Sequence, residues 1–265
     1  PELWDGLQNT NPEASKLPIF PIMFVSIACG AISGFHATQS PLMARCMTSE
    51  RHGRPVFYGA MITEGIVALI WAAAATYFFH KNGMEESNAS VIVDAITKEW
   101  LGAIGGILAI LGVIAAPITS GDTAFRSARL IVADFLGMEQ KSMRHRLYIC
   151  IPMFVVAIGL LLYSLRDANG FNMIWRYFAW ANQTLAVFTL WAITVFLAVS
   201  KKPYIITLIP ALFMTSVCST YICIAPEGLG LSPVVSYSVG IACVVIAAVW
   251  FYVWLGKQKT RKLSE

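Results

Sequence analysis

Polar residues gather in one short stretch of an otherwise apolar segment, between Gly30 and Pro41. The stretch carries hydroxyl, imidazole and amide groups at Ser33, His36, Thr38, Gln39 and Ser40. At membrane depth such groups are unfavourable unless they meet partners or line a cavity. A helix interrupted at Gly30 and Gly34 would free main-chain groups and a helix N-terminus to bind a carboxylate or a cation. The same glycine spacing is equally typical of close packing against a neighbouring helix.

His36 has two interpretations: a structural histidine near the cytoplasmic end of a packed helix, or a ligand for substrate or protons. Pro41 is expected to end the helix and to favour an extended Ser40. The substrate site that we predict from this stretch comprises Gly30, Ser33, Gly34, His36 and Gln39.

A second set of residues could couple transport to an ion or a proton. Glu64 lies about a third of the way along an apolar run, where it either hydrogen-bonds a neighbouring helix or carries a proton or ion. Further along the chain come oxygen-bearing side chains suited to a small cation, Thr119, Ser120, Asp122 and Thr123. Alternatively, Ser120 or Asp122 caps a helix over 123–136 that ends at Gly137 and lies along the inner membrane surface, with Asp122 and Arg126 paired.

Two smaller patterns favour packing over chemistry. Asn182 and Gln183, in an apolar run below Trp175, Tyr177 and Trp180, are expected to hydrogen-bond between helices. The six cysteines have neither a CxxC pair nor matching histidine spacing, so we interpret them as packing residues and predict no bound metal.

The elements that must position these groups are transmembrane helices. The chain is 57% hydrophobic and 13% charged, with a mean hydropathy of +0.65, which is typical of an all-α polytopic membrane protein. A soluble helical protein would need amphipathic stripes, whereas 240–252 is apolar all round. We predict a transmembrane domain over 18–256 with seven spans, near 18–39, 56–79, 100–120, 147–165, 175–199, 203–223 and 232–256.

The basic residues predict the orientation. Fourteen of the 19 lysines and arginines fall in alternate connections, which places the polar segment 1–17 outside and the tail 257–265 in the cytoplasm. The formal charge of +4 follows from these inner loops and requires no nucleic acid. Because the chain begins at Pro1 with a polar stretch, we expect it to be the C-terminal portion of a longer protein whose first helices precede it.

Four segments together resemble the carbon-starvation protein A (CstA) family of bacterial inner-membrane transporters. They are SGFHATQSPLMARC, YGAMITEGIVALIWAAAATYFF, PITSGDTAFRSARLIVADFLG and FNMIWRYFAWANQTLA. The resemblance implies uptake of pyruvate or short peptides by proton symport, as part of the response to carbon starvation, with no cofactor beyond a coupling proton or Na⁺. It also implies a leucine-transporter-like fold of two inverted five-helix repeats, in which span 18–39 is the broken sixth helix. Thr119 and Ser120 then fall where such folds place hydroxyl ligands for a cation.

Two other functional classes are alternatives to a transporter: a membrane enzyme, and a nutrient sensor or scaffold. A membrane enzyme would need a nucleophile with its base, or a His/Asp metal cluster, on facing helices, and the histidines at 36, 52, 80 and 145 are scattered on different sides of the membrane. We therefore expect no enzyme. A nutrient sensor or scaffold without flux is the alternative, and transport by the purified protein separates it from a carrier.

Overall fold

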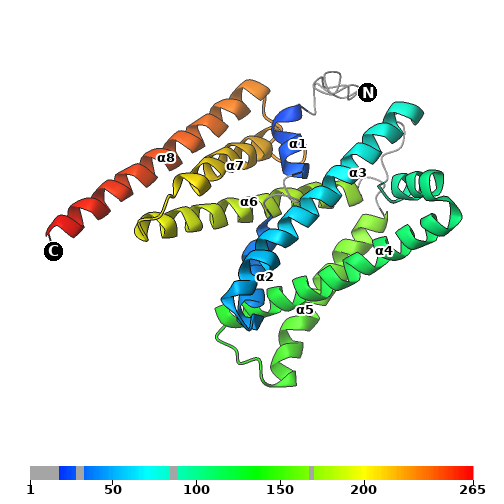
Figure 1. The fold of residues 1–265 in the computed structure, drawn as a ribbon, viewed down its shortest axis with the longest axis horizontal. Helices are drawn as coiled ribbons and strands as arrows, with labels where there is room; N and C mark the ends of the chain where they lie inside the picture. The colour runs from blue at the N-terminus through cyan, green and yellow to red at the C-terminus, as the bar shows by residue number, and fades with distance from the viewer. Residues whose placement is uncertain (1–17, 28–32, 84–88, 167–169, 265) are drawn as a thin grey trace. The chain divides into compact units, whose positions relative to one another are not determined.

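The computed structural model describes residues 18–27, 33–83, 89–166 and 170–264. All regular structure within these ranges is helical (Figure 1), which confirms the predicted all-α class. The helices form two compact units. The first is described over 48–83 and 89–166, and the second over 18–27, 33–47 and 170–264.

The first unit holds one long and two shorter helices behind a brief irregular entry. The entry consists of the 3₁₀-helix η3 (Glu50–His52) and the π-helical turn η4 (Arg54–Gly59). The helices are α3 (Ala60–Asn82), α4 (Ala89–Phe135) and α5 (Met143–Arg166). Helix α4 packs on α3 and on α5, and non-helical torsion angles at Gly102 divide its course. It ends before Gly137, as predicted, where the chain turns with φ +63°.

Helix α4 corrects one prediction about the Thr119–Thr123 region. The helix is continuous from 103 through 135, so no new helix begins at 123 and neither Ser120 nor Asp122 caps one. The Asp122 carboxylate instead accepts a 2.6 Å hydrogen bond from the Arg126 guanidinium, one turn along the helix, and this confirms the predicted ion pair.

The second unit is centred on α7. It contains α1 (Ile19–Ile27), α2 (Gly34–Cys46), α6 (Gly170–Val199), α7 (Ile205–Ile224) and α8 (Pro233–Ser264). Helix α7 lies between α6 and α8, with α1 packed against it (Figure 1). Leu208, Met214 and Val217 of α7 are almost completely buried. The core of this unit therefore follows α7.

Helix α2 contradicts the expectation that Pro41 ends a helix. Pro41 lies inside α2, which continues to Cys46. Helices of membrane proteins tolerate an internal proline because neighbouring helices, hydroxyl groups and small backbone adjustments compensate for the missing hydrogen bond.

Six helices among the described residues are long and apolar enough to cross a membrane, by length and composition. They lie at Glu50–Asn82, Val91–Gly112, Met143–Arg166, Met173–Val199, Ile205–Ile224 and Pro233–Gln258. The segment predicted as the first span, 18–39, contains α1 and the beginning of α2, which are 9 and 13 residues long. The chain is therefore a multi-pass membrane protein. The described part of its first apolar segment contributes to two short helices, α1 and α2.

Candidate functional site

Helix α1 is held by aromatic packing against α7 and α8. Phe24 meets Phe213 of α7 edge to face at 5.1 Å, and the Tyr237 hydroxyl of α8 donates a 3.1 Å hydrogen bond to the Phe20 carbonyl. Val25, 1% exposed, belongs to the same buried cluster as Met214. The second half of α1 is therefore fixed against the core of the unit.

Helix α2 begins in close contact with α6. A β-carbon added at Gly34 would overlap the Asn182 carbonyl oxygen and lie 2.7 Å from the Leu185 β-carbon. Only glycine fits this approach without displacing one of the two helices. The packing interpretation of the glycine pattern therefore holds for Gly34, while Gly30 lies outside the described residues.

Ser33 joins this contact through hydrogen bonds. The Asn182 amide nitrogen donates to the Ser33 hydroxyl oxygen at 3.0 Å, which confirms the predicted role of Asn182 between helices. The Ser33 main-chain N–H donates to His36 Nδ1 at 3.1 Å, and its carbonyl accepts from the His36 main-chain N–H at 3.1 Å. The main-chain groups of Ser33 are thus occupied, contrary to the expectation that a helix break leaves them free.

A partly polar cavity lies where α1, α6 and the end of α7 meet. Its volume is about 220 Å³, and its polar lining comes from Ser26, Arg176, Tyr221 and Glu227. Its apolar lining comes from Ile22, Val25, Trp175, Ala179, Ala225 and Pro226. A cavity that offers both a cation and an anion can hold water or a small polar solute.

Glu227 is the most constrained polar group of this cavity. Its side chain is 7% exposed and pairs with the Arg176 guanidinium at 3.5 Å. The Tyr221 hydroxyl donates a 2.6 Å hydrogen bond to the other carboxylate oxygen, and the Tyr177 hydroxyl donates to the Glu227 carbonyl. A buried carboxylate is stable only with such partners, so the four side chains form one unit.

The turn after α7 places Glu227 in the cavity. The Gly228 N–H donates to the Ala225 carbonyl at 2.9 Å, and the Leu229 N–H donates to the Ile222 carbonyl at 2.9 Å. A β-carbon at Gly228 would overlap the Ile222 carbonyl oxygen. Glycine is therefore required for this turn to fold back on α7.

Helix α6 connects the cavity with the start of α2. Ala179 lines the cavity, and Asn182, one turn further along the same helix, bonds Ser33. The second half of α1 and the first residues of α2 therefore contact neighbouring turns of one helix. Residues 28–32 lie outside the described residues.

The other predicted site residues fall elsewhere. Gln39 is half-buried on α2. The proposed coupling residues belong to the first unit, where Glu64 is exposed on α3 and Ser120 and Asp122 are exposed on α4. Thr123 is half-buried on α4, which also contains Thr119, whose side chain lies outside the described ones. The structure thus groups Ser33, Gly34 and His36 at one contact.

Sequence reasoning missed Arg176, Tyr221 and Glu227. A single glutamate in the Pro-Glu-Gly turn between two apolar runs was the available signal, because such a turn needs no charge for its own geometry. The partner of Glu227 is 51 residues away, and nothing in the local pattern indicates that pairing.

Comparison with known proteins gives a consistent family assignment. The family described as "Carbon starvation protein CstA" matches residues 8–97 and 81–221. A Haemophilus influenzae protein described as "Uncharacterized protein" is 44% identical over 132 residues, which are 50% of this chain and 91% of that protein. An "Uncharacterized membrane protein" of the same organism is 51% identical over 81 residues, 31% of this chain and 20% of that protein.

A longer relative carries a functional name. The "Peptide transporter CstA" of Bacillus subtilis is 28% identical over 242 residues, which cover 74% of this chain and 40% of that protein. The chain therefore spans less than half the length of that relative. No solved structure matches the chain significantly.

Proposed function

Because this chain belongs to the carbon starvation protein CstA family, we propose that it forms part of a carrier for pyruvate or short peptides. Relatives described as peptide transporters support this proposal. In it, substrate enters the cell by alternating access, driven by protons or by Na⁺, as part of the response to carbon starvation. The remaining helices of the longer protein complete the site, in a leucine-transporter-like arrangement.

The observation that carries the proposal is a cavity with a buried carboxylate and its arginine partner beside the short helix α1. Carriers bind ions and carboxylates beside helix ends within the membrane. Because the main-chain groups of Ser33 are already hydrogen-bonded, side chains beside α1 supply the polar contacts in this proposal. Here α1 lines the cavity that holds Arg176 and Glu227. Ser33, just before α2, bonds Asn182, one helical turn along α6 from the cavity wall. The proposal also includes substrate contacts by Gly30, Ser33, Gly34, His36 and Gln39, although Ser33, Gly34, His36 and Gln39 do not line the cavity.

The cavity in this unit favours a small carboxylate. Its volume of about 220 Å³ lies below the roughly 300–1,000 Å³ of pockets that enclose larger ligands. The Arg176 side chain is 43% exposed, so its guanidinium is accessible to a second carboxylate. A substrate carboxylate would share the Arg176 guanidinium with Glu227, so Arg176 is the proposed contact between the substrate and the Glu227 side chain.

Glu64, with Thr119, Ser120, Asp122 and Thr123, remains a proposed coupling group of the first unit. Substitutions of Glu227 and Glu64 distinguish the two candidate coupling groups. If Glu227 couples the proton, Glu227→Gln abolishes gradient-driven accumulation and Glu64→Gln does not. If Glu64 couples it, the reverse holds.

The test is uptake by the full-length protein that contains this chain, purified and reconstituted in proteoliposomes. Labelled pyruvate and a labelled dipeptide are supplied with an imposed proton or Na⁺ gradient. We expect accumulation of one substrate above its equilibrium level, and we expect Arg176→Gln to raise its KM. Lys98→Gln, which removes an exposed cation on α4, is the matched control. Accumulation of neither substrate contradicts the carrier and favours a sensor or scaffold.

The proposal includes a location in the bacterial inner membrane with the C-terminus in the cytoplasm. A single reporter cysteine after residue 258, in a background without native cysteines, tests this orientation. It should react with a membrane-impermeant thiol reagent in inverted vesicles and remain unlabelled in intact cells.

A further inference from the structure

A cationic cavity lies between α4 and α5 of the first unit, separate from the proposed pocket. Its volume is about 500 Å³. Arg126 and Arg129 of α4 line it together with Arg146 of α5. Asp122, Phe125, Cys150 and Phe154 complete its wall.

The arginines of this cavity are incompletely neutralised. Asp122 pairs with Arg126 at 2.6 Å, so three guanidinium groups face one carboxylate in the lining. Arg146 uses its Nε–H for the Gln140 carbonyl at 2.6 Å, which leaves its two terminal nitrogens available. The Nε of Arg129 is buried and lacks an acceptor among the described residues. Buried donors normally have partners, so the cavity calls for an anion with several acceptor oxygens.

The surroundings identify what kind of anion fits. Arg146 stands in the first turn of α5, whose Met143–Arg166 stretch is apolar enough to span a membrane. Beyond it, Ile151, Phe154 and Ile158 are 57%, 47% and 54% exposed. Cations at the end of a span, followed by exposed apolar side chains, match a phosphate at the membrane surface with acyl chains below it.

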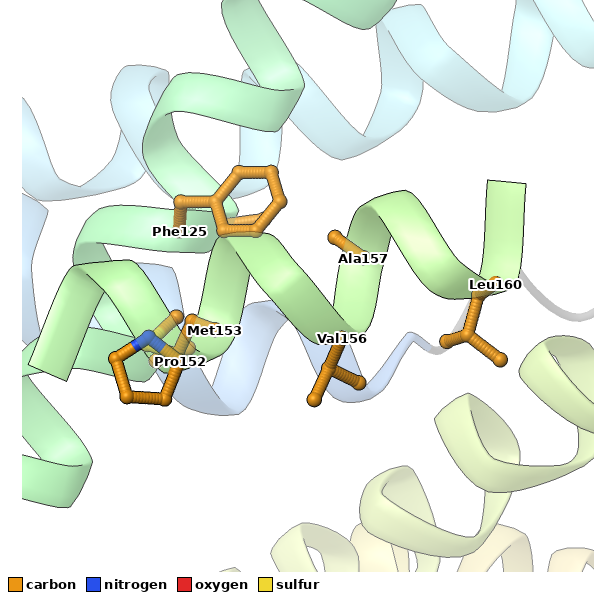
Figure 2. A pocket seen from close by; sticks show the side chains of 8 residues that line it. Phe125, Pro152, Met153, Val156, Ala157 and Leu160 are labelled. Atoms are coloured by element: carbon orange, nitrogen blue, oxygen red, sulfur yellow. The ribbon is translucent and has the colours of Figure 1, made fainter. Parts of the chain in front are cut away.

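A second cavity on the same two helices adds apolar surface. It has a volume of about 480 Å³, and Ala124, Phe125, Ala128 and five residues of α5 contribute to its wall. Figure 2 shows Phe125 of α4 above the α5 segment that carries Pro152, Val156 and Leu160. Phe125 borders both cavities and stacks on Phe154 at 4.8 Å. Charged and apolar surfaces therefore adjoin, as a phospholipid requires.

We propose that the cavity between α4 and α5 binds the phosphate headgroup of an anionic phospholipid through Arg126, Arg129 and Arg146. Guanidinium groups bind phosphate oxygens in pairs, and Arg129 and Arg146 have donors to offer. The acyl chains lie along the exposed face of α5. The lipid proposal does not depend on which substrate is carried, and it shares Asp122 with the proposed coupling residues of the first unit.

Native mass spectrometry of the full-length protein tests the proposal, with equal amounts of phosphatidylglycerol and phosphatidylcholine in the detergent. We expect the protein to retain phosphatidylglycerol preferentially. The double variant Arg129→Gln/Arg146→Gln should lower that preference about tenfold or more, as expected when two cations at the membrane surface are lost. Asp122→Asn should raise the preference, because it removes the only carboxylate in the described lining.

The control variant Lys141→Gln/Arg144→Gln removes the same charge from two exposed positions, Lys141 in the α4–α5 connection and Arg144 in the first turn of α5. It should leave the preference within about twofold of the parent, since neither residue lines the cavity. If the Arg129→Gln/Arg146→Gln variant misfolds, its melting temperature falls. Misfolding cannot explain the stronger preference for phosphatidylglycerol that we expect of Asp122→Asn.

Three outcomes would overturn the lipid site. The first is equal retention of both lipids by the parent protein. The second is an unchanged preference in the Arg129/Arg146 variant, as expected if another part of the longer protein fills the cavity. The third is displacement of the bound lipid by millimolar pyruvate or inorganic phosphate, which would assign the arginines to a soluble anion.

Discussion

Replacing Gly34 by alanine tests the contact on which the proposed pocket depends. The new methyl group would overlap the Asn182 carbonyl oxygen and lie 2.7 Å from the Leu185 β-carbon. Carbon atoms pack at about 3.5–4.0 Å, so α2 and α6 must separate by about 0.8 Å or more. The Ser33–Asn182 hydrogen bond, now 3.0 Å, is lost if the helices separate by that amount along its axis.

The expected cost follows from these two effects. Overpacking of a tight contact costs about 1–3 kcal/mol. A hydrogen bond between membrane helices contributes about 0.6 kcal/mol on average. Replacing glycine by alanine adds little helix propensity at the first residue of α2. We therefore expect the free energy of unfolding to fall by about 2 kcal/mol, which is about 30-fold in the unfolding equilibrium constant.

The measurement is the unfolding free energy of the full-length protein in mixed micelles, supported by its melting temperature. Gly159→Ala in α5 is the matched control, because nothing lies within 4 Å of the added carbon. It should leave stability unchanged or raise it by up to about 1 kcal/mol. If the unfolding free energy of Gly34→Ala equals those of the parent and of Gly159→Ala, the close approach of α2 to α6 does not exist in the intact protein.

Three further outcomes follow from the contacts of the two units. Ser33→Ala and Asn182→Ala should show a coupling energy of about 0.6 kcal/mol in a double-mutant cycle, and strictly additive effects would deny the hydrogen bond between them. Gly228→Ala should cost about 1–3 kcal/mol and reduce gradient-driven uptake, since it displaces the turn that carries Glu227; normal stability would refute that turn geometry. Lys98→Met should change stability by no more than about 0.5 kcal/mol, because Lys98 forms an exposed pair with Asp94 one turn away; a larger loss would show that the pair is buried in the intact protein.

The helical class and the approximate positions of the helices could be predicted from the sequence because their signal is local. Long apolar runs indicate membrane helices by their composition alone. Helix α8, predicted as a span over 232–256, is observed at Pro233–Ser264. Orientation remains a prediction from the positions of the basic residues.

Helix boundaries were harder because rules from soluble proteins mislead in a membrane. Pro41 and the hydroxyl residues near Asp122 are typical signals of a helix end or start in water. In a membrane helix, hydroxyls commonly bond the preceding turn of the same helix instead. Thr97 and Thr184 do so here, with bonds of 2.7 and 2.9 Å to carbonyls four residues earlier. The same residue types therefore continue a helix.

The site was predictable only where its signal was local. Gly34 and Ser33 stood out because small and polar residues interrupt an apolar run. Their partner Asn182 is 149 residues away from Ser33, and the predicted role of Asn182 named no partner. The Arg176–Glu227 pair was invisible for the same reason, since pairing between distant helices depends on how the helices pack.

Helix α6 makes the two halves of the candidate pocket depend on each other. Ala179 and Asn182 are three residues apart, which is about 4.5 Å along a helix. Any change that moves α2 away from Asn182 therefore disturbs a turn of α6. The neighbouring turn of α6 carries Ala179, which lines the cavity. It follows that Gly34→Ala should alter the substrate KM as well as stability, although Gly34 does not line the cavity. Uptake by Gly34→Ala with an unchanged KM, measured below its melting temperature, would mean that α2 and the cavity act independently.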